Sequence, residues 1–168
     1  GRIVDYKNIN FVIKNIFDIR HSLNKNVYLI VVGTGSEEYV NELKKYANSL
    51  GVSSYIIFTG FLDNPNKILT SLDLLVAPSL IDAFGRTIIE AMIQKTPVLA
   101  AKSGGHIDII SDGVNGMFYE PTIKDDFIKK ISIIMNMTNI STLSDNAYQF
   151  AQSNFSPKQH LNNILPIY

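Results

Sequence analysis

The segment from Pro78 to Glu90 holds residues that could bind a phosphate and the hydroxyls of an attached sugar. Asp82 lies in a loop after an apolar run, Gly85 lies near the start of the next predicted helix, and Glu90 lies inside that helix. Free N–H groups and the helix dipole at a helix start favour a phosphate or diphosphate near Gly85. Glu90 lies roughly a turn and a half further on. There its carboxylate is too far for the same phosphate, but it can accept a hydrogen bond from a sugar hydroxyl.

Apolar runs that alternate with helix-like patterns predict the fold that positions this segment. Almost entirely apolar runs predict buried strands at residues 27–32, 55–59, 74–77, 97–101 and 115–119. Helical spacing predicts helices at residues 8–21, 36–50, around 68–69, 84–94, 106–110, 123–137, 144–153 and 157–165. Strands without polar alternation are buried on both faces, and strands that alternate with helices are parallel. The pattern therefore predicts an α/β protein with a Rossmann-like, doubly wound parallel sheet and helices on both faces.

Small residues follow the predicted strands where a ligand would bind. In doubly wound sheets, ligands bind beyond the carboxyl ends of the strands. Those ends carry Gly33-Thr34-Gly35, Gly60-Phe61, Pro78-Ser79 and Ser103-Gly104-Gly105. Glycine lets the backbone approach a ligand closely, so these loops are the expected walls of the site. The first of them lacks the remaining G-x-x-G of the dinucleotide fingerprint, which disfavours a nicotinamide-dependent dehydrogenase.

The composition excludes several other classes of protein. The 168 residues carry 15 Lys and Arg against 15 Asp and Glu, and this net charge of zero disfavours general nucleic-acid binding. A hydrophobic content of 46% excludes disorder and fits one domain with a real core. The absence of cysteine excludes thiolate chemistry and fits a reducing compartment. The three histidines, His21, His106 and His160, lack metal-binding spacing, and no apolar run is long enough to span a bilayer.

The stretch from Asp82 to Glu90 resembles the E-x7-E signature of retaining glycosyltransferases with the GT-B fold, family GT4 in particular. Further motifs of that family's nucleotide-sugar-binding domain follow in its order and spacing across nearly the whole chain. They are Gly1-Arg2-Ile3 with Lys7, Val31-Val32-Gly33-Thr34-Gly35, Phe58-Thr59-Gly60-Phe61, residues 73–79, Glu90-Ala91-Met92, Pro97-Val98, Gly104-Gly105, Asp112-Gly113 and Asn115-Gly116. One such motif would be weak evidence, whereas this many in order make the resemblance strong.

The resemblance implies a UDP- or GDP-sugar as donor and no cofactor. Arg2, Lys7, Asp82 and Glu90 are the catalytic positions that it implies. Arg2 and Lys7 would neutralise the diphosphate as it leaves, Glu90 would bind the ribose hydroxyls, and Asp82 would face the donor sugar. The other donor-binding positions are Gly33, Gly35, Gly60, Phe61, Leu62, Phe84, Gly85, Arg86, Thr87, Gly104 and Gly105. Because basic side chains and helix amides supply the positive field, no metal is expected.

Two positions depart from the family's pattern, and one histidine has two readings. Asp82 is one methylene shorter than the usual Glu, so its reach to the sugar and the choice of donor sugar are open. Asn8 stands where the family usually has Gly, and Asn tolerates the left-handed conformation that such a turn requires. His106 is explained equally well as a hydrogen-bond donor to the sugar or pyrophosphate and as an ordinary loop histidine.

The resemblance further implies that residues 1–168 form a single C-terminal donor-binding domain, one half of a GT-B enzyme, with a helical tail over about 141–168. The acceptor, a glycan or a lipid-linked molecule, would bind mostly to an N-terminal domain that these residues do not include. The whole enzyme would be a cytoplasmic, metal-independent, retaining hexosyltransferase of polysaccharide biosynthesis, with association to the inner face of the membrane left open. The isolated half would show little turnover. The alternative, which Asp82 keeps open, is a non-catalytic nucleotide-sugar-binding module with the same fold.

Overall fold

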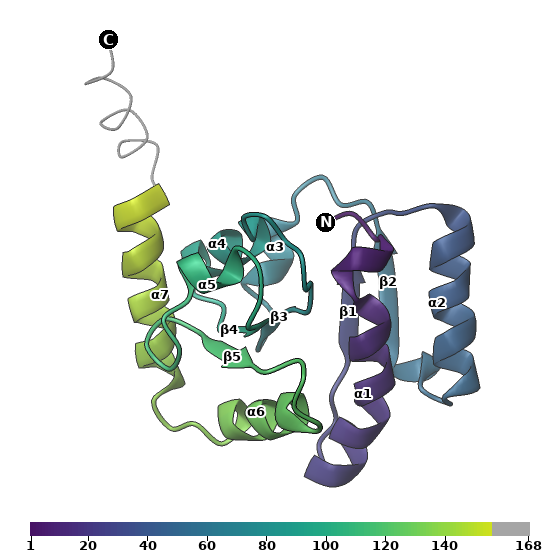
Figure 1. The fold of residues 1–168 in the computed structure, drawn as a ribbon. Coiled ribbons are helices and arrows are strands. Elements are labelled where there is room, and N and C mark those ends of the chain that lie inside the picture. Colours follow the sequence, from purple (N-terminus) through teal and green to yellow (C-terminus); the bar gives the residue numbers. More distant parts are fainter. Residues whose placement is uncertain (156–168) are drawn as a thin grey trace.

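The strands pair in parallel, as the buried apolar runs predict. In the computed structural model, which describes residues 1–155, β1 (Leu29–Val32) pairs with β2 (Ile56–Gly60). A second ladder pairs β3 (Leu75–Ala77) with β4 (Val98–Ala101), and β4 with β5 (Met117–Tyr119). The expected α/β class with parallel strands is confirmed, and its hydrogen-bonded ladders fall into these two groups (Figure 1).

Helices connect the strands in the predicted order. They are η1 (Asp5–Lys7), α1 (Ile9–Leu23), α2 (Glu37–Ser49), η2 (Ser53–Tyr55), α3 (Asn66–Leu69), α4 (Arg86–Ile93), α5 (His106–Ile109), α6 (Asp126–Met135) and α7 (Ile140–Phe155). Helix α7 begins four residues before the start of the helix predicted at residues 144–153. It forms the expected helical tail as far as residue 155, where the described residues end. The helix predicted at residues 157–165 lies outside the described residues. None of the helices within residues 1–155 combines the length and apolarity that crossing a membrane requires.

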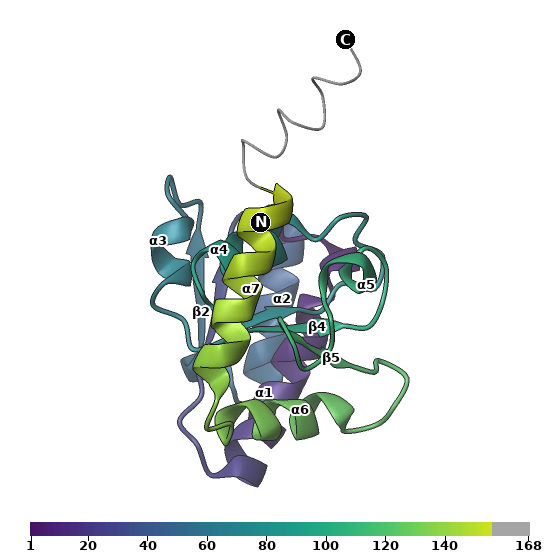
Figure 2. The same cartoon turned by 90° about the vertical axis from the view of Figure 1, so that its left-hand side faces the viewer.

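Helices cover both faces of the three-stranded ladder, because alternate residues of β4 point into different cores. Val98 and Ala100 lie in a core with residues of α4, α5 and α7. Leu99 and Ala101 lie in another core, with residues of α1 and α6. Every residue of β4 is buried, which explains why its sequence carries no polar alternation. Figure 2 shows α7 crossing in front of this ladder, and Figure 1 shows α2 on the opposite side of the molecule.

The two-stranded ladder has its own core between α1 and α2. Ile13 of α1, Leu43 of α2, Val31 of β1 and Ile56 of β2 are buried together there. Since α1 also contributes to the core shared with α6, it ties the two ladders to each other. The chain turns from η1 into α1 at Asn8, whose φ of 55° is left-handed. The sequence prediction for Asn8 is thus confirmed.

Candidate functional site

Lys7 and Asp82 form a partly buried ion pair at the carboxyl ends of the strands. The Lys7 Nζ lies 2.5 Å from the Asp82 Oδ2, and the two side chains are 27% and 20% exposed. Burial raises the pKa of the Asp82 carboxyl, but the hydrogen bond and charge of Lys7 outweigh it, with further help from His106 and the Gly85 N–H. The pKa of Asp82 therefore lies below its ordinary value, and this carboxyl is ionised near neutral pH.

Two hydrogen bonds with the loop after β3 fix the backbone on either side of Lys7. The buried Ser79 hydroxyl donates to the Tyr6 carbonyl at 3.0 Å. The Asn8 side-chain amide donates to the Pro78 carbonyl at 3.2 Å. Sequence reasoning placed Ser79 in a loop expected to wall the site, but did not predict its hydrogen bond to the backbone beside Lys7. Together these bonds aim Lys7 at the loop that carries Asp82.

His106 lies beneath this ion pair and is fully buried. Its Nδ1 lies 3.0 Å from the Ala101 carbonyl. Because a carbonyl only accepts, Nδ1 must carry the hydrogen. Its Nε2 has no hydrogen-bond partner and lies 3.9 Å from the Asp82 Oδ2. Of the two readings of this histidine, direct contact with a ligand does not fit this burial, and His106 instead faces the Asp82 carboxylate from the protein interior.

The N-terminus of α4 provides free backbone N–H groups next to the ion pair. Its N-cap, Gly85, has a φ of 65°, and no side chain caps the helix. The uncapped first turn can therefore donate to an anion. Thr87, predicted as a donor contact, lies in this turn. The Arg86 side chain is 82% exposed, and one of its nitrogens lies 3.6 Å from Glu90 Oε1, one helical turn further on. The start of α4 thus offers N–H donors to an anion and, one turn further on, a carboxylate on an accessible face.

The glycines of the loop after β4 are needed for contact with the loop before α4. A Cβ on Gly104 would lie 2.6 Å from the Asp82 carbonyl oxygen, and a Cβ on Gly105 would lie 2.3 Å from that of Ala83. The Gly105 N–H also donates to the Asp82 carbonyl at 2.8 Å, and the Ser103 hydroxyl donates to the Leu80 carbonyl. These contacts explain both glycines by packing, and their place beside a donor sugar stays a prediction.

A similar close approach explains the glycines after β1. A Cβ on Gly33 would lie 1.7 Å from the Gly1 carbonyl oxygen, and one on Gly35 would lie 2.1 Å from that of Ile3. The Ile3 N–H donates to the Thr34 carbonyl at 2.7 Å, so residues 1–3 cross the end of β1.

The remaining predicted residues surround these contacts without forming one cluster. The Arg2 guanidinium donates to the Tyr6 hydroxyl at 3.2 Å, and the Tyr6 ring lies 5.6 Å from the Lys7 Nζ. Gly60 accepts from the Gly33 N–H at 3.0 Å, which joins the ends of β1 and β2. Three apolar residues line the outer parts of these loops: Phe61 is exposed, Leu62 is half-buried, and Phe84 is exposed and packs edge-on against Phe155. Among residues 1–155, no group of three or more His, Asp or Glu side chains could hold a metal ion.

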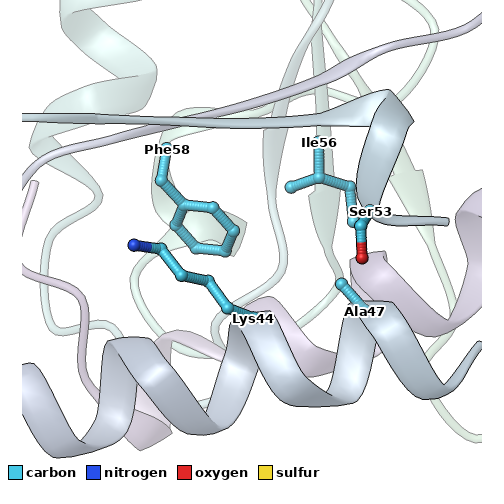
Figure 3. A pocket seen from close by; sticks show the side chains of 5 residues that line it. All are labelled: Lys44, Ala47, Ser53, Ile56 and Phe58. Carbon is cyan, nitrogen blue, oxygen red and sulfur yellow. The ribbon is translucent and has the colours of Figure 1, made fainter.

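A separate hollow of about 360 Å³ lies between α2 and β2 (Figure 3). Its lining consists of Lys44, Ala47, Ser53, Ile56 and Phe58. The Lys44 ammonium lies over the Phe58 ring at 5.7 Å. None of the predicted site residues lines this hollow, so it is distinct from the site at the strand ends.

The geometry combines a lysine, an uncapped helix start and an accessible carboxylate at the carboxyl ends of parallel strands. Residues 1–152 match the family model of the glycosyl transferases group 1. The chain belongs to this family. The predicted glycosyltransferase family is thereby confirmed. The GT4 assignment, the retaining mechanism and the role of each residue toward a donor stay predictions.

Three proteins resemble this chain over nearly its whole length. The lipopolysaccharide core biosynthesis glycosyltransferase LpsE of Rhizobium meliloti is 29% identical over 157 residues, which are 93% of this chain and 44% of LpsE. Anabaena HepE in complex with UDP-glucose is 28% identical with a TM-score of 0.87, and the match covers all of this chain and 47% of HepE. The C-terminal domain of LpcC, a group 1 protein from Francisella tularensis, is 25% identical with a TM-score of 0.78, covering 94% of this chain and 84% of that domain. The chain thus spans less than half the length of LpsE and HepE.

Proposed function

We propose that this glycosyltransferase chain is the C-terminal, donor-binding half of a GT4-like enzyme that transfers a hexose from a UDP-sugar with retention of configuration. The observation that carries the proposal is the position of Lys7 beside the uncapped N-terminus of α4, with Glu90 one turn further along. HepE, which shares this fold, is in complex with UDP-glucose, and this supports a uridine nucleotide as donor. A GDP-sugar is the competing donor.

In this proposal the chain stabilises the leaving nucleoside diphosphate. Lys7 and the first N–H groups of α4 donate to the diphosphate oxygens, where negative charge grows as the glycosidic bond breaks. Glu90 accepts hydrogen bonds from the ribose hydroxyls, and Arg2 adds positive charge at the rim. No side chain at the strand ends is placed as a nucleophile, so the proposal assigns none. Since amides and basic side chains supply the positive field, transfer is proposed to be independent of a metal ion.

The acceptor is proposed to bind outside this chain. The likeness to the C-terminal domain of LpcC supports the assignment to a C-terminal half, in which case an N-terminal half completes the cleft. LpsE, by its name a lipopolysaccharide core enzyme, supports a glycan or lipid-linked acceptor. A cytoplasmic location, at the inner face of the membrane, completes the proposal and fits the absence of cysteine.

Calorimetric titration with UDP, GDP and NAD tests the donor proposal. We expect UDP to bind, GDP to bind more weakly and NAD not to bind. Replacing Glu90 by Gln should reduce UDP affinity by about tenfold or more, because hydrogen bonds to a charged group are among the stronger ones. A Glu42→Gln variant, which removes an exposed carboxylate of α2, is the matched control and should bind UDP as the wild type does. UDP affinity that is unchanged in Glu90→Gln would refute ribose binding by Glu90.

The same fold could also serve as a non-catalytic nucleotide-sugar-binding module, and turnover separates the two functions. The protein from the complete gene should release UDP from UDP-glucose when an acceptor is supplied, and EDTA should leave the rate unchanged. UDP binding without any turnover, over a range of glycan and lipid-linked acceptors, would favour the binding module. A rate abolished by EDTA would contradict metal independence.

A further inference from the structure

The charges next to the diphosphate site form a chain of three groups. Lys7 pairs with Asp82, and the unpartnered Nε2 of His106 faces the same carboxylate oxygen from the interior. We propose that Asp82 and His106 form a proton-coupled counter-charge for Lys7, so that a diphosphate which draws Lys7 away from Asp82 causes His106 to take up a proton. This inference rests on the proposed function for its ligand, and it makes His106 a positioning residue.

Lys7 is already occupied in the free protein. Its ammonium lies 2.5 Å from the Asp82 carboxylate, and most of both side chains is removed from solvent. An arriving diphosphate must therefore share Lys7 with Asp82 or draw it away. Either way, the Asp82 carboxylate comes to lie beside a second anion while it loses part of its own counter-charge. An uncompensated, mostly buried carboxylate is strongly unfavourable.

His106 is the group that can supply the missing charge. The Ala101 carbonyl occupies the hydrogen on Nδ1, so the neutral ring presents a bare lone pair on Nε2 toward Asp82. Adding a proton at Nε2 turns this unpartnered acceptor into a charged donor aimed at Asp82 Oδ2. A shift of about 1 Å would bring the two atoms from 3.9 Å to hydrogen-bond distance. Histidine changes charge near neutral pH, so solvent can supply the proton under ordinary conditions.

The other charged groups near His106 are already engaged or point to solvent. On α4, which packs against α5, Arg86 faces Glu90. On α5 itself, Asp108 is exposed. Within residues 1–155, Lys7 and His106 are the basic side chains that lie within 4 Å of the Asp82 carboxylate. When Lys7 leaves, His106 is thus the remaining described group that can balance Asp82.

Calorimetry of UDP binding in buffers of different ionisation enthalpy measures the proton. We expect the wild-type chain to take up protons as UDP binds, and to take up more than a variant that lacks the His106 ring. The His106→Asn variant keeps a donor for the Ala101 carbonyl but has no Nε2, so it should bind UDP without this uptake. The matched control is His21→Asn, because the His21 Nδ1 also lies 2.9 Å from a carbonyl, that of Phe17, at the far end of α1. His21→Asn should retain the wild-type uptake.

UDP that binds without proton uptake, or equal uptake in wild type and His106→Asn, would overturn the proton coupling and leave the proposed function intact. Asp82→Asn should bind UDP more tightly, by about tenfold, because Lys7 then lacks a competing carboxylate. Weaker UDP binding by Asp82→Asn would overturn the counter-charge role.

A second measurement needs no ligand and so stands apart from the proposed function. Replacing Lys7 by Met imitates the loss of Lys7 from Asp82. In nitrogen NMR spectra at pH 7, the protonated fraction of the His106 ring should be larger in Lys7→Met than in wild type, and the double variant with Asp82→Asn should lose this increase. A His106 ring whose protonated fraction is the same in all three proteins would overturn the inference, whatever UDP does.

Discussion

Gly105→Ala is predicted to weaken donor binding by displacing the loop before α4. Gly105 has a φ of −66° and a ψ of −6°, a backbone conformation that alanine adopts without strain. The effect is therefore purely steric, since the new Cβ would lie 2.3 Å from the Ala83 carbonyl oxygen and 3.0 Å from the Phe84 Cα. Ordinary contact requires the loop to move by about 1 Å. That movement would reorient the start of α4 and with it the N–H groups that are proposed to hold the diphosphate.

The expected cost has two parts. Forced contact in a packed region should lower the free energy of unfolding by about 1–3 kcal/mol, measured by urea denaturation. A displacement of this size at a binding site should reduce UDP affinity by about tenfold to a hundredfold, measured by calorimetry. Gly113→Ala is the control, because Gly113 has a φ of 74° with no atom near its Cβ position. It should lose about 1–2 kcal/mol of stability and no UDP affinity. The reasoning would be refuted if Gly105→Ala bound UDP as tightly as the wild type does, or if Gly105→Ala and Gly113→Ala lost the same amount of UDP affinity.

Three further predictions concern stability, each measured by urea denaturation. Asn8→Ala should cost about 1–2 kcal/mol from its left-handed backbone alone, whereas Asn8→Gly should lose chiefly the hydrogen bond to the Pro78 carbonyl; equal losses would contradict this account. Thr96→Val should cost about 1–3 kcal/mol because the buried Thr96 hydroxyl donates to the Leu69 carbonyl at 2.7 Å, and Thr96→Ser should restore most of it. Burial raises the pKa of Asp82, but the larger effect of Lys7 leaves the pKa in the folded protein below the ordinary value of 3.8. The ionised carboxyl therefore stabilises the fold at pH values above 3.8, and this contribution is lost as the pH falls through the pKa of the folded protein. Asp82→Asn should therefore flatten the fall in stability below about pH 5, and an unchanged acid limb would contradict the ion pair.

The fold class could be predicted because burial leaves a simple pattern, while the ends of the elements depend on hydrogen bonds that the pattern does not contain. The predicted first strand starts at Val27, but the Val27 N–H donates to the Lys25 carbonyl in a turn, and β1 begins at Leu29. The predicted fifth strand starts at Asn115, but that side chain accepts from the Ser111 N–H and donates to the Ile109 carbonyl. Asn115 thus closes a turn, and β5 begins two residues later.

The candidate site could be predicted in its parts but not in its pairing. A glycine at a helix start after a buried strand indicates an anion site from local sequence alone, and α4 begins there as expected. The contact of Lys7 with Asp82 joins residues 75 positions apart. Motif spacing places both near the strand ends without showing that one neutralises the other. The burial of His106 depends on how α5 packs against α4, which no short sequence pattern specifies.

This pairing changes how a lysine in the site would act on a diphosphate. A free ammonium would attract the bound donor as well as the departed diphosphate, and the part of the attraction that is common to both does not lower the barrier to bond cleavage. Lys7 is paired with Asp82 in the free protein, so the diphosphate of a bound donor must compete with Asp82 for Lys7. The negative charge on the diphosphate grows as the glycosidic bond breaks, and its hold on Lys7 should then exceed that of Asp82. With His106 available to balance the carboxylate, the ion pair would direct the stabilisation by Lys7 toward the leaving group rather than the bound donor.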